Sequence, residues 1–164
     1  MATTKSASTT TTPEAQLRSF IAKLEPKTQK LFRAVRTAVR KRFPAANELA
    51  YDYPTSLVIS YSPSDRGIEG IVSLAAREDG VRLYFNEGPR LPDPKRLLLG
   101  SGKSVRYVEV DAASRLAHPD VRALIAAAIA ASKVPMPAKG KGQLIIRSDG
   151  AAKKPARKTA GVKR

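Results

Sequence analysis

The chain of 164 residues contains no cysteine and no tryptophan, and His118 is its only histidine. The absence of cysteine excludes disulfide bonds, thiolate metal sites and cysteine nucleophiles. A single histidine excludes zinc sites of the usual composition, and a Ser-His-Asp triad would depend entirely on this side chain. Because His118 directly precedes Pro119, we expect it to cap a helix or to lie in a loop.

N-terminal targeting features and long apolar runs are also missing. Residues 1–12 contain one lysine, no arginine and no apolar run, which argues against a secretory signal and a membrane span in this segment. We therefore expect a cytoplasmic protein. The length suits one domain with tails.

Acidic residues are scarce, since 14 Asp and Glu stand against 30 Lys and Arg, which gives a net charge of +16. About half of the excess lies in residues 135–164, where Asp149 is the only acidic residue. Clustered cations attract phosphates, so this asymmetry favours an anionic partner such as nucleic acid, while a solubilising tail is the alternative. The tail residues that we expect to contact nucleic acid without sequence preference are Lys153, Lys154, Arg157 and Lys158.

Three helices are predicted from capping signals and from apolar residues at helical spacing. The first begins at Pro13 after the cap residue Thr12 and ends near Leu24. The second begins at Pro26 and is stopped by Pro44. A third begins around Pro119 and ends before residue 135.

Between residues 47 and 110 the pattern changes to short strands, including 57–61, 71–76, 81–85 and 106–110. The sequence predicts an α+β domain at residues 13–134, with an antiparallel sheet of about five strands and N-terminal and C-terminal helices packed on one face. Residues 1–12 and the basic tail 151–164 are expected to be disordered. Residues 135–150 are expected to be a linker, in which residues 143–147 could form an edge strand.

The order of these parts resembles the YdhG-like domain family over about residues 14–133. The resemblance is carried by the Pro44 to Glu48 step, the Tyr53-Pro54 pair, the Gly-x-x-Leu-x-Asp-Pro turn at 88–94 and the Gly-Ser-Gly-Lys turn at 100–103. It implies a compact α+β fold with helices on one face of an antiparallel sheet. The family includes bacterial proteins described as frataxin-like iron chaperones, so the resemblance also implies intracellular iron binding by surface carboxylates as an alternative function.

The Gly-Ser-Gly-Lys-Ser turn invites comparison with a nucleotide-binding P-loop. The first glycine of that motif would fall at Leu97, and a strand is predicted where the motif requires a helix. Three other interpretations of this turn are possible. It could be a nest of backbone amides that binds a phosphate or carboxylate, a small-molecule enzyme site, or a plain turn with positive φ. The candidate anion-binding residues are Gly100, Ser101, Gly102, Lys103 and Arg106.

A basic stripe on the second helix is predicted opposite its apolar arc, and its nucleic-acid-binding candidates are Arg33, Arg36 and Arg40. A solvated helix face is the alternative. Aromatic residues do not interleave with this stripe, so we do not expect bases to stack there.

No motif indicates a cofactor. Iron would have to use carboxylates, and the candidate pairs are Glu48 with Asp52, Asp65 with Glu69, Glu78 with Asp79, and Glu109 with Asp111. We therefore predict a non-enzymatic binding or accessory protein with an anionic partner. A frataxin-like iron chaperone and a small-molecule enzyme at the Gly100 to Arg106 turn are the alternatives.

Overall fold

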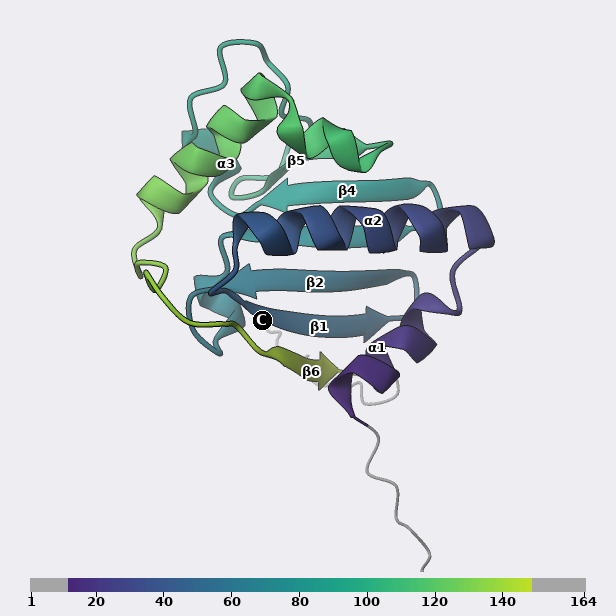
Figure 1. Ribbon diagram of the computed structural model, residues 1–164. Helices are drawn as coiled ribbons and strands as arrows, with labels where there is room; N and C mark the ends of the chain where they lie inside the picture. The colour runs from purple at the N-terminus through teal and green to yellow at the C-terminus, as the bar shows by residue number, and fades with distance from the viewer. Residues whose placement is uncertain (1–11, 149–164) are drawn as a thin grey trace, which may run out of the picture.

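The computed structural model describes residues 12–148 and has an α+β fold, in which three helices cover one face of a six-stranded sheet (Figure 1). The helices are α1 (Pro13–Ile21), α2 (Pro26–Arg42) and α3 (Pro119–Ala131). The strands are β1 (Asn47–Tyr53), β2 (Ser56–Ser62), β3 (Val72–Arg77), β4 (Gly80–Phe85), β5 (Arg106–Val110) and β6 (Leu144–Ser148). The short 3-10 helices are η1 (Gly67–Glu69), η2 (Gly88–Arg90) and η3 (Ala113–Ala117).

The sheet has the strand order β5-β4-β3-β2-β1-β6. Neighbouring strands from β1 to β5 are antiparallel, whereas β6 pairs parallel to β1 at the edge. The fold class predicted from sequence is therefore confirmed, with one strand more than the expected five. This extra strand occupies the segment that could form an edge strand, and the folded unit extends past residue 134 to Ser148.

The core lies between the helices and one face of the sheet. Alternate strand residues such as Ile59, Leu74 and Leu83 are completely buried there, together with Phe32 and Val35 of α2. Successive strand side chains point to opposite faces, which accounts for the alternating pattern in β4. The sheet's apolar face and the apolar stripe of α2 exclude water together.

The predicted helix starts are confirmed, because Thr12 accepts a hydrogen bond from the Ala15 amide and both Pro13 and Pro26 occupy first-turn positions. The predicted end of the first helix is wrong by three residues. The helix ends at Ile21, and the amide of Leu24 instead bonds the Ile21 carbonyl in a tight turn. Pro26 imposes extended backbone on the preceding residue, so the chain leaves the helix before it reaches that proline.

The residues that lead into β6 lie tightly against the end of the α2 to β1 connection. The Gly142 amide donates to the Pro44 carbonyl at 3.0 Å, and the Gln143 carbonyl accepts from the Glu48 amide at 2.8 Å. A Cβ atom on Gly142 would lie 1.6 Å from the Ala46 carbonyl oxygen, so only glycine fits at this approach. Within residues 12–148, no helix is both long and apolar enough to cross a membrane.

Candidate functional site

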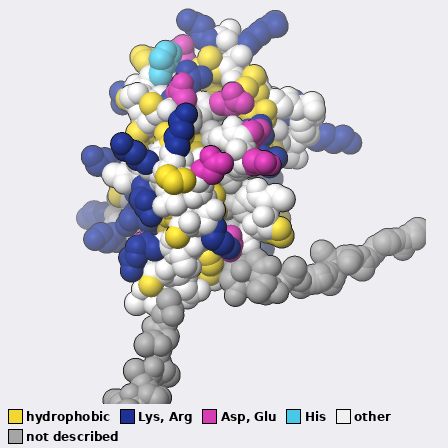
Figure 2. Space-filling view, turned by 90° about the vertical axis from the view of Figure 1, so that its right-hand side faces the viewer, with side chains coloured by type: hydrophobic (Ala, Val, Ile, Leu, Met, Phe, Trp, Pro, Cys, Tyr) yellow, Lys and Arg dark blue, Asp and Glu magenta, His cyan; other side chains and the backbone are white. Residues whose placement is uncertain are grey.

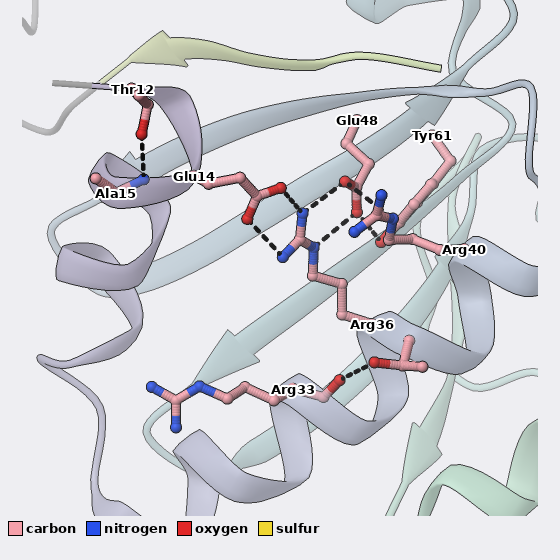
Figure 3. A network of polar contacts seen from close by, with 9 residues as sticks. Thr12, Glu14, Ala15, Arg33, Arg36, Arg40, Glu48 and Tyr61 are labelled. Carbon is pink, nitrogen blue, oxygen red and sulfur yellow. Dashed lines mark hydrogen bonds and ion pairs between the residues drawn. The ribbon is translucent and has the colours of Figure 1, made fainter. Parts of the chain in front are cut away.

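Arg36 of the predicted basic stripe points inward and binds two carboxylates (Figure 3). Its Nε and Nη2 donate to Glu48 of β1 at 2.9 and 2.7 Å, and its Nη1 and Nη2 donate to Glu14 of α1 at 3.3 and 3.0 Å. The Tyr61 hydroxyl donates to Glu48 at 2.9 Å. The Arg36 side chain is 12% exposed, so it links α1, α2, β1 and β2 instead of facing a partner.

The charges of this network reinforce one another. The hydrogen bond from Arg36 lowers the pKa of Glu14, against an opposing effect of partial burial. Burial alone would lower the pKa of Arg36, but its hydrogen bonds to Glu48 and Glu14 raise it. Burial, and then the charge of Glu48, raises the pKa of Tyr61 well above 10. Arg36 is therefore charged and neutralised within the fold, which differs from its predicted place on an open stripe.

The other two predicted arginines of α2 remain at the surface. Arg33 is exposed and forms no ion pair with any residue of the described chain, while Arg40 is half exposed with its Nε 3.6 Å from Glu48. Further exposed cations without an ion pair in residues 12–148 follow along the same helix: Lys27, Lys30, Lys41 and Arg42. Lys and Arg accordingly crowd the helix side of the molecule, on the left of Figure 2.

A cavity of about 270 Å³ lies where α2 ends and the chain enters β6. Three cations line it, Arg40 and Lys41 from α2 and Lys141 from the segment before β6. Glu48 lies among the lining residues, and its carboxylate is already held by Arg36. The fold thus gathers cations that are 100 residues apart in sequence, which no local pattern indicated.

The Gly100 to Arg106 turn leads into β5, whose first residue is Arg106, and Gly100 lies beside Tyr107. Gly100 has φ of 103°, and the bridge between Leu99 and Tyr107 closes the turn. Arg106 donates to the carbonyls of Gly102 and Val105, so the guanidinium that we predicted to assist anion binding is occupied by the turn itself. Ser101, Gly102 and Lys103 are exposed, and β5 follows where a P-loop would have a helix.

His118 is the N-cap of α3, as predicted, and its Nδ1 accepts a hydrogen bond from the Asp120 amide at 3.2 Å. Among the candidate carboxylate pairs, Glu48 and Asp52 both lie on the buried face of β1, where Glu48 binds Arg36 and Asp52 binds Lys23. In the part of the chain that the structure describes, no three His, Cys, Asp or Glu side chains form a group able to hold a metal ion.

Four tyrosines lie on the sheet face opposite the helices, a feature that the sequence only partly indicated. Tyr51 and Tyr53 stack along β1 with ring centroids 5.7 Å apart, and Tyr84 and Tyr107 pair across β4 and β5 at 5.2 Å. The Arg82 guanidinium carbon lies 4.3 Å from the Tyr107 ring centroid. Of these four rings, only Tyr53 is largely exposed, at 46%.

Comparisons with family models, with curated proteins and with solved structures give no match to this chain. The resemblance to the YdhG-like family therefore stays a prediction. The fold presents a basic helix surface whose neighbouring carboxylates, Glu14 and Glu48, are bound by Arg36.

Proposed function

We propose that this protein is a non-enzymatic binding protein that contacts nucleic acid through a basic surface formed by α2 and the segment before β6. The contact is made to phosphates and carries no sequence preference. A YdhG-like family membership and a cytoplasmic location belong to the same proposal.

The observation that carries the proposal is the convergence of Arg40, Lys41 and Lys141 around the cavity at the end of α2. Because Arg36 and Arg40 together balance the charges of Glu14 and Glu48, a phosphate at this cavity would meet Lys41 and Lys141 without strong repulsion from the buried carboxylate. Hydrogen bonds from Lys and Arg to phosphate oxygens are charge-assisted and roughly twice as strong as those between neutral groups.

The rest of α2 extends this surface. Lys30 and Lys41 are 11 residues apart on the helix, which corresponds to roughly 16 Å, or about the rise of five base pairs. Lys30, Arg33 and Lys41 are exposed along this length, so several phosphates of one strand can be contacted together. Such an array supports salt-sensitive binding, because each neutralised phosphate releases counterions.

The two alternatives gain no supporting contact. At the enzyme site, Arg106 binds carbonyls of the turn, which leaves the exposed Lys103 as the cation of the Gly100 to Arg106 turn without Arg106 beside it to form a convergent pair. An iron site needs converging carboxylates, yet Glu48 and Asp52 each bind a different cation.

Fluorescence anisotropy of a short labelled DNA duplex with the full chain tests the proposal. We expect the affinity to fall steeply with salt, and to be weakened by joint substitution of Arg40→Gln, Lys41→Gln and Lys141→Gln. A matched control replaces Arg66, Lys95 and Lys133, which are exposed and do not line the cavity. Equal losses in both triple variants would show that net charge, and not this surface, determines binding.

A further inference from the structure

A groove of about 690 Å³ lies at the end of the sheet where β1 turns into β2, beside the link between α1 and α2. Apolar side chains form much of its wall, including Phe20, Leu24 and Leu57, and Tyr53 lies at its edge. Asp52 is the buried acidic residue of the groove and is 4% exposed. The groove is separate from the basic cavity of Arg40, Lys41 and Lys141, because no residue lines both.

Asp52 receives one ammonium from within the chain. Lys23 Nζ donates to Asp52 Oδ2 at 2.5 Å, and this nitrogen lies 5.5 Å from the centroid of the Phe20 ring. No residue within 12–148 donates a hydrogen bond to the other carboxylate oxygen, Oδ1. A carboxylate has sites for about four hydrogen bonds, so this buried group retains accepting capacity toward the groove.

The ion pair between Lys23 and Asp52 differs from the ion pair between Arg36 and Glu48, which also contains a buried carboxylate. The Glu48 and Asp52 side chains are each 6% exposed, but their cationic partners differ in exposure. The Arg36 side chain is 12% exposed, whereas the Lys23 side chain is 63% exposed. Arg36 is enclosed by the structure that it supports. Lys23 reaches its carboxylate from solvent, so its ammonium can leave without rearrangement of the core.

Charge at the groove differs from charge on the helix side. Glu25 and Glu78 also line the groove and form no ion pair with the described residues. Its two cations are Lys23, which binds Asp52, and Arg77, whose Nε lies 3.6 Å from Asp79. Acidic side chains accordingly appear on the end of the molecule that faces the viewer in Figure 2, beside the basic helix side.

We propose that this groove binds a small aliphatic primary amine or diamine, with its ammonium on Asp52 in the position that Lys23 Nζ occupies. Lys23 is a tethered alkylammonium, and its contact with Asp52 and Phe20 demonstrates the chemistry that the groove recognises. The apolar wall accommodates the alkyl chain of the ligand. The carboxylates of Glu25 and Glu78 at the groove favour a second ammonium, so a diamine binds more tightly than a monoamine.

Chemical rescue tests this inference in the full chain. In Lys23→Ala, Asp52 loses its partner, and we expect added butylamine or diaminobutane to raise the unfolding temperature in a saturable manner. The wild type responds to the same amines with an affinity lower by roughly tenfold, because Lys23 occupies the carboxylate most of the time. Tetramethylammonium at equal ionic strength has no N–H donor and leaves the unfolding temperature of Lys23→Ala unchanged.

Lys27→Ala is the matched control, since it removes the same charge from an exposed position of α2 that does not line the groove. Lys27→Ala must respond only with the weaker affinity of the wild type, and the response must be absent in Lys23→Ala combined with Asp52→Asn. An equal response of Lys23→Ala and Lys27→Ala, or a response that persists after Asp52→Asn, overturns the proposal.

A second measurement covers the case in which Lys23→Ala does not fold. Diaminobutane is titrated into the wild type and into Asp52→Asn while amide resonances are followed by NMR. Saturable shifts around Asp52 and Tyr53 in the wild type alone support the site. Identical shifts in both proteins, or none in the wild type at saturating amine, contradict it.

Discussion

The Arg36 guanidinium holds the Glu48 carboxylate through two hydrogen bonds, Nε to Oε2 at 2.9 Å and Nη2 to Oε1 at 2.7 Å. This relationship fixes α2 on β1 and removes from the surface the negative charge that would otherwise oppose the neighbouring cations. Because both groups are largely buried, breaking the pair on one side leaves an uncompensated charge in the fold.

Arg36→Met is expected to destabilise the protein by about 3–5 kcal/mol, because the buried Glu48 then keeps only the half-exposed Arg40, whose Nε lies 3.6 Å away. The free energy of unfolding from urea titration measures this loss. Arg33→Met is the matched control on the exposed face of the same helix and should change stability by less than about 0.5 kcal/mol. In Arg36→Met combined with Glu48→Met, much of the lost stability should return; a double variant as unstable as the single one contradicts this explanation.

Glu14 provides a pH-dependent test of the same network. Its pKa is lowered from the ordinary value of 4.5, chiefly by the hydrogen bond from Arg36. A lowered pKa in the folded state means that the contribution to stability is present above pH 4.5 and is lost as the pH falls through the lower folded value. Urea titrations of the wild type below this pH should lose stability more steeply than those of Glu14→Gln. Parallel curves for the two proteins would exclude a contribution of this carboxylate.

The position of Arg36 illustrates how far the sequence could predict this site. Arg36 follows Phe32 by four residues and Val35 by one, so it lies at the border of the buried stripe and not opposite it. That spacing was a usable signal. The partner was not predictable, because Glu48 reaches Arg36 only when β1 pairs with β2 and places this side chain on the helix-facing side.

The helix starts and the strand alternation were predictable because their causes are local. Thr12 and Pro13 determine the start of α1 through a cap and a fixed φ, and Leu83 alternates with Arg82 along β4. The placement of β6 and the gathering of Lys141 with Arg40 depend on contacts across about 100 residues. The groove at Asp52 likewise depends on tertiary packing, since Lys23 and Asp52 are 29 residues apart.

Residues 149–164 carry six Lys and Arg against Asp149, and the tail residues predicted to bind nucleic acid, Lys153, Lys154, Arg157 and Lys158, lie outside the described residues. Their contribution can be measured directly. Removal of this segment should weaken DNA binding and should flatten the dependence of log affinity on log salt by about 0.9 for each lost phosphate contact.

The matched control for this truncation keeps the tail length and replaces its six Lys and Arg by Gln. We expect it to reproduce the reduced salt dependence while the unfolding temperature stays that of the wild type. An unchanged slope in both proteins would assign all phosphate contacts to the folded part and would leave the tail without a role in binding.

Gly142→Ala tests the junction that brings β6 and Lys141 to the end of α2. The new methyl group would overlap the Ala46 carbonyl, so we expect a loss of about 1–3 kcal/mol from forced displacement of the backbone. The displacement should also weaken the bond from the Glu48 amide to the Gln143 carbonyl, which hydrogen exchange of that amide reports. Gln143→Ala is the control, because its side chain is exposed and the same backbone bond persists.

If Lys141 belongs to the DNA-binding surface, Gly142→Ala should lower DNA affinity as well, whereas Gln143→Ala should not. Normal protection of the Glu48 amide in Gly142→Ala would mean that the chain relieves the overlap elsewhere, and the predicted effect on binding would then be absent.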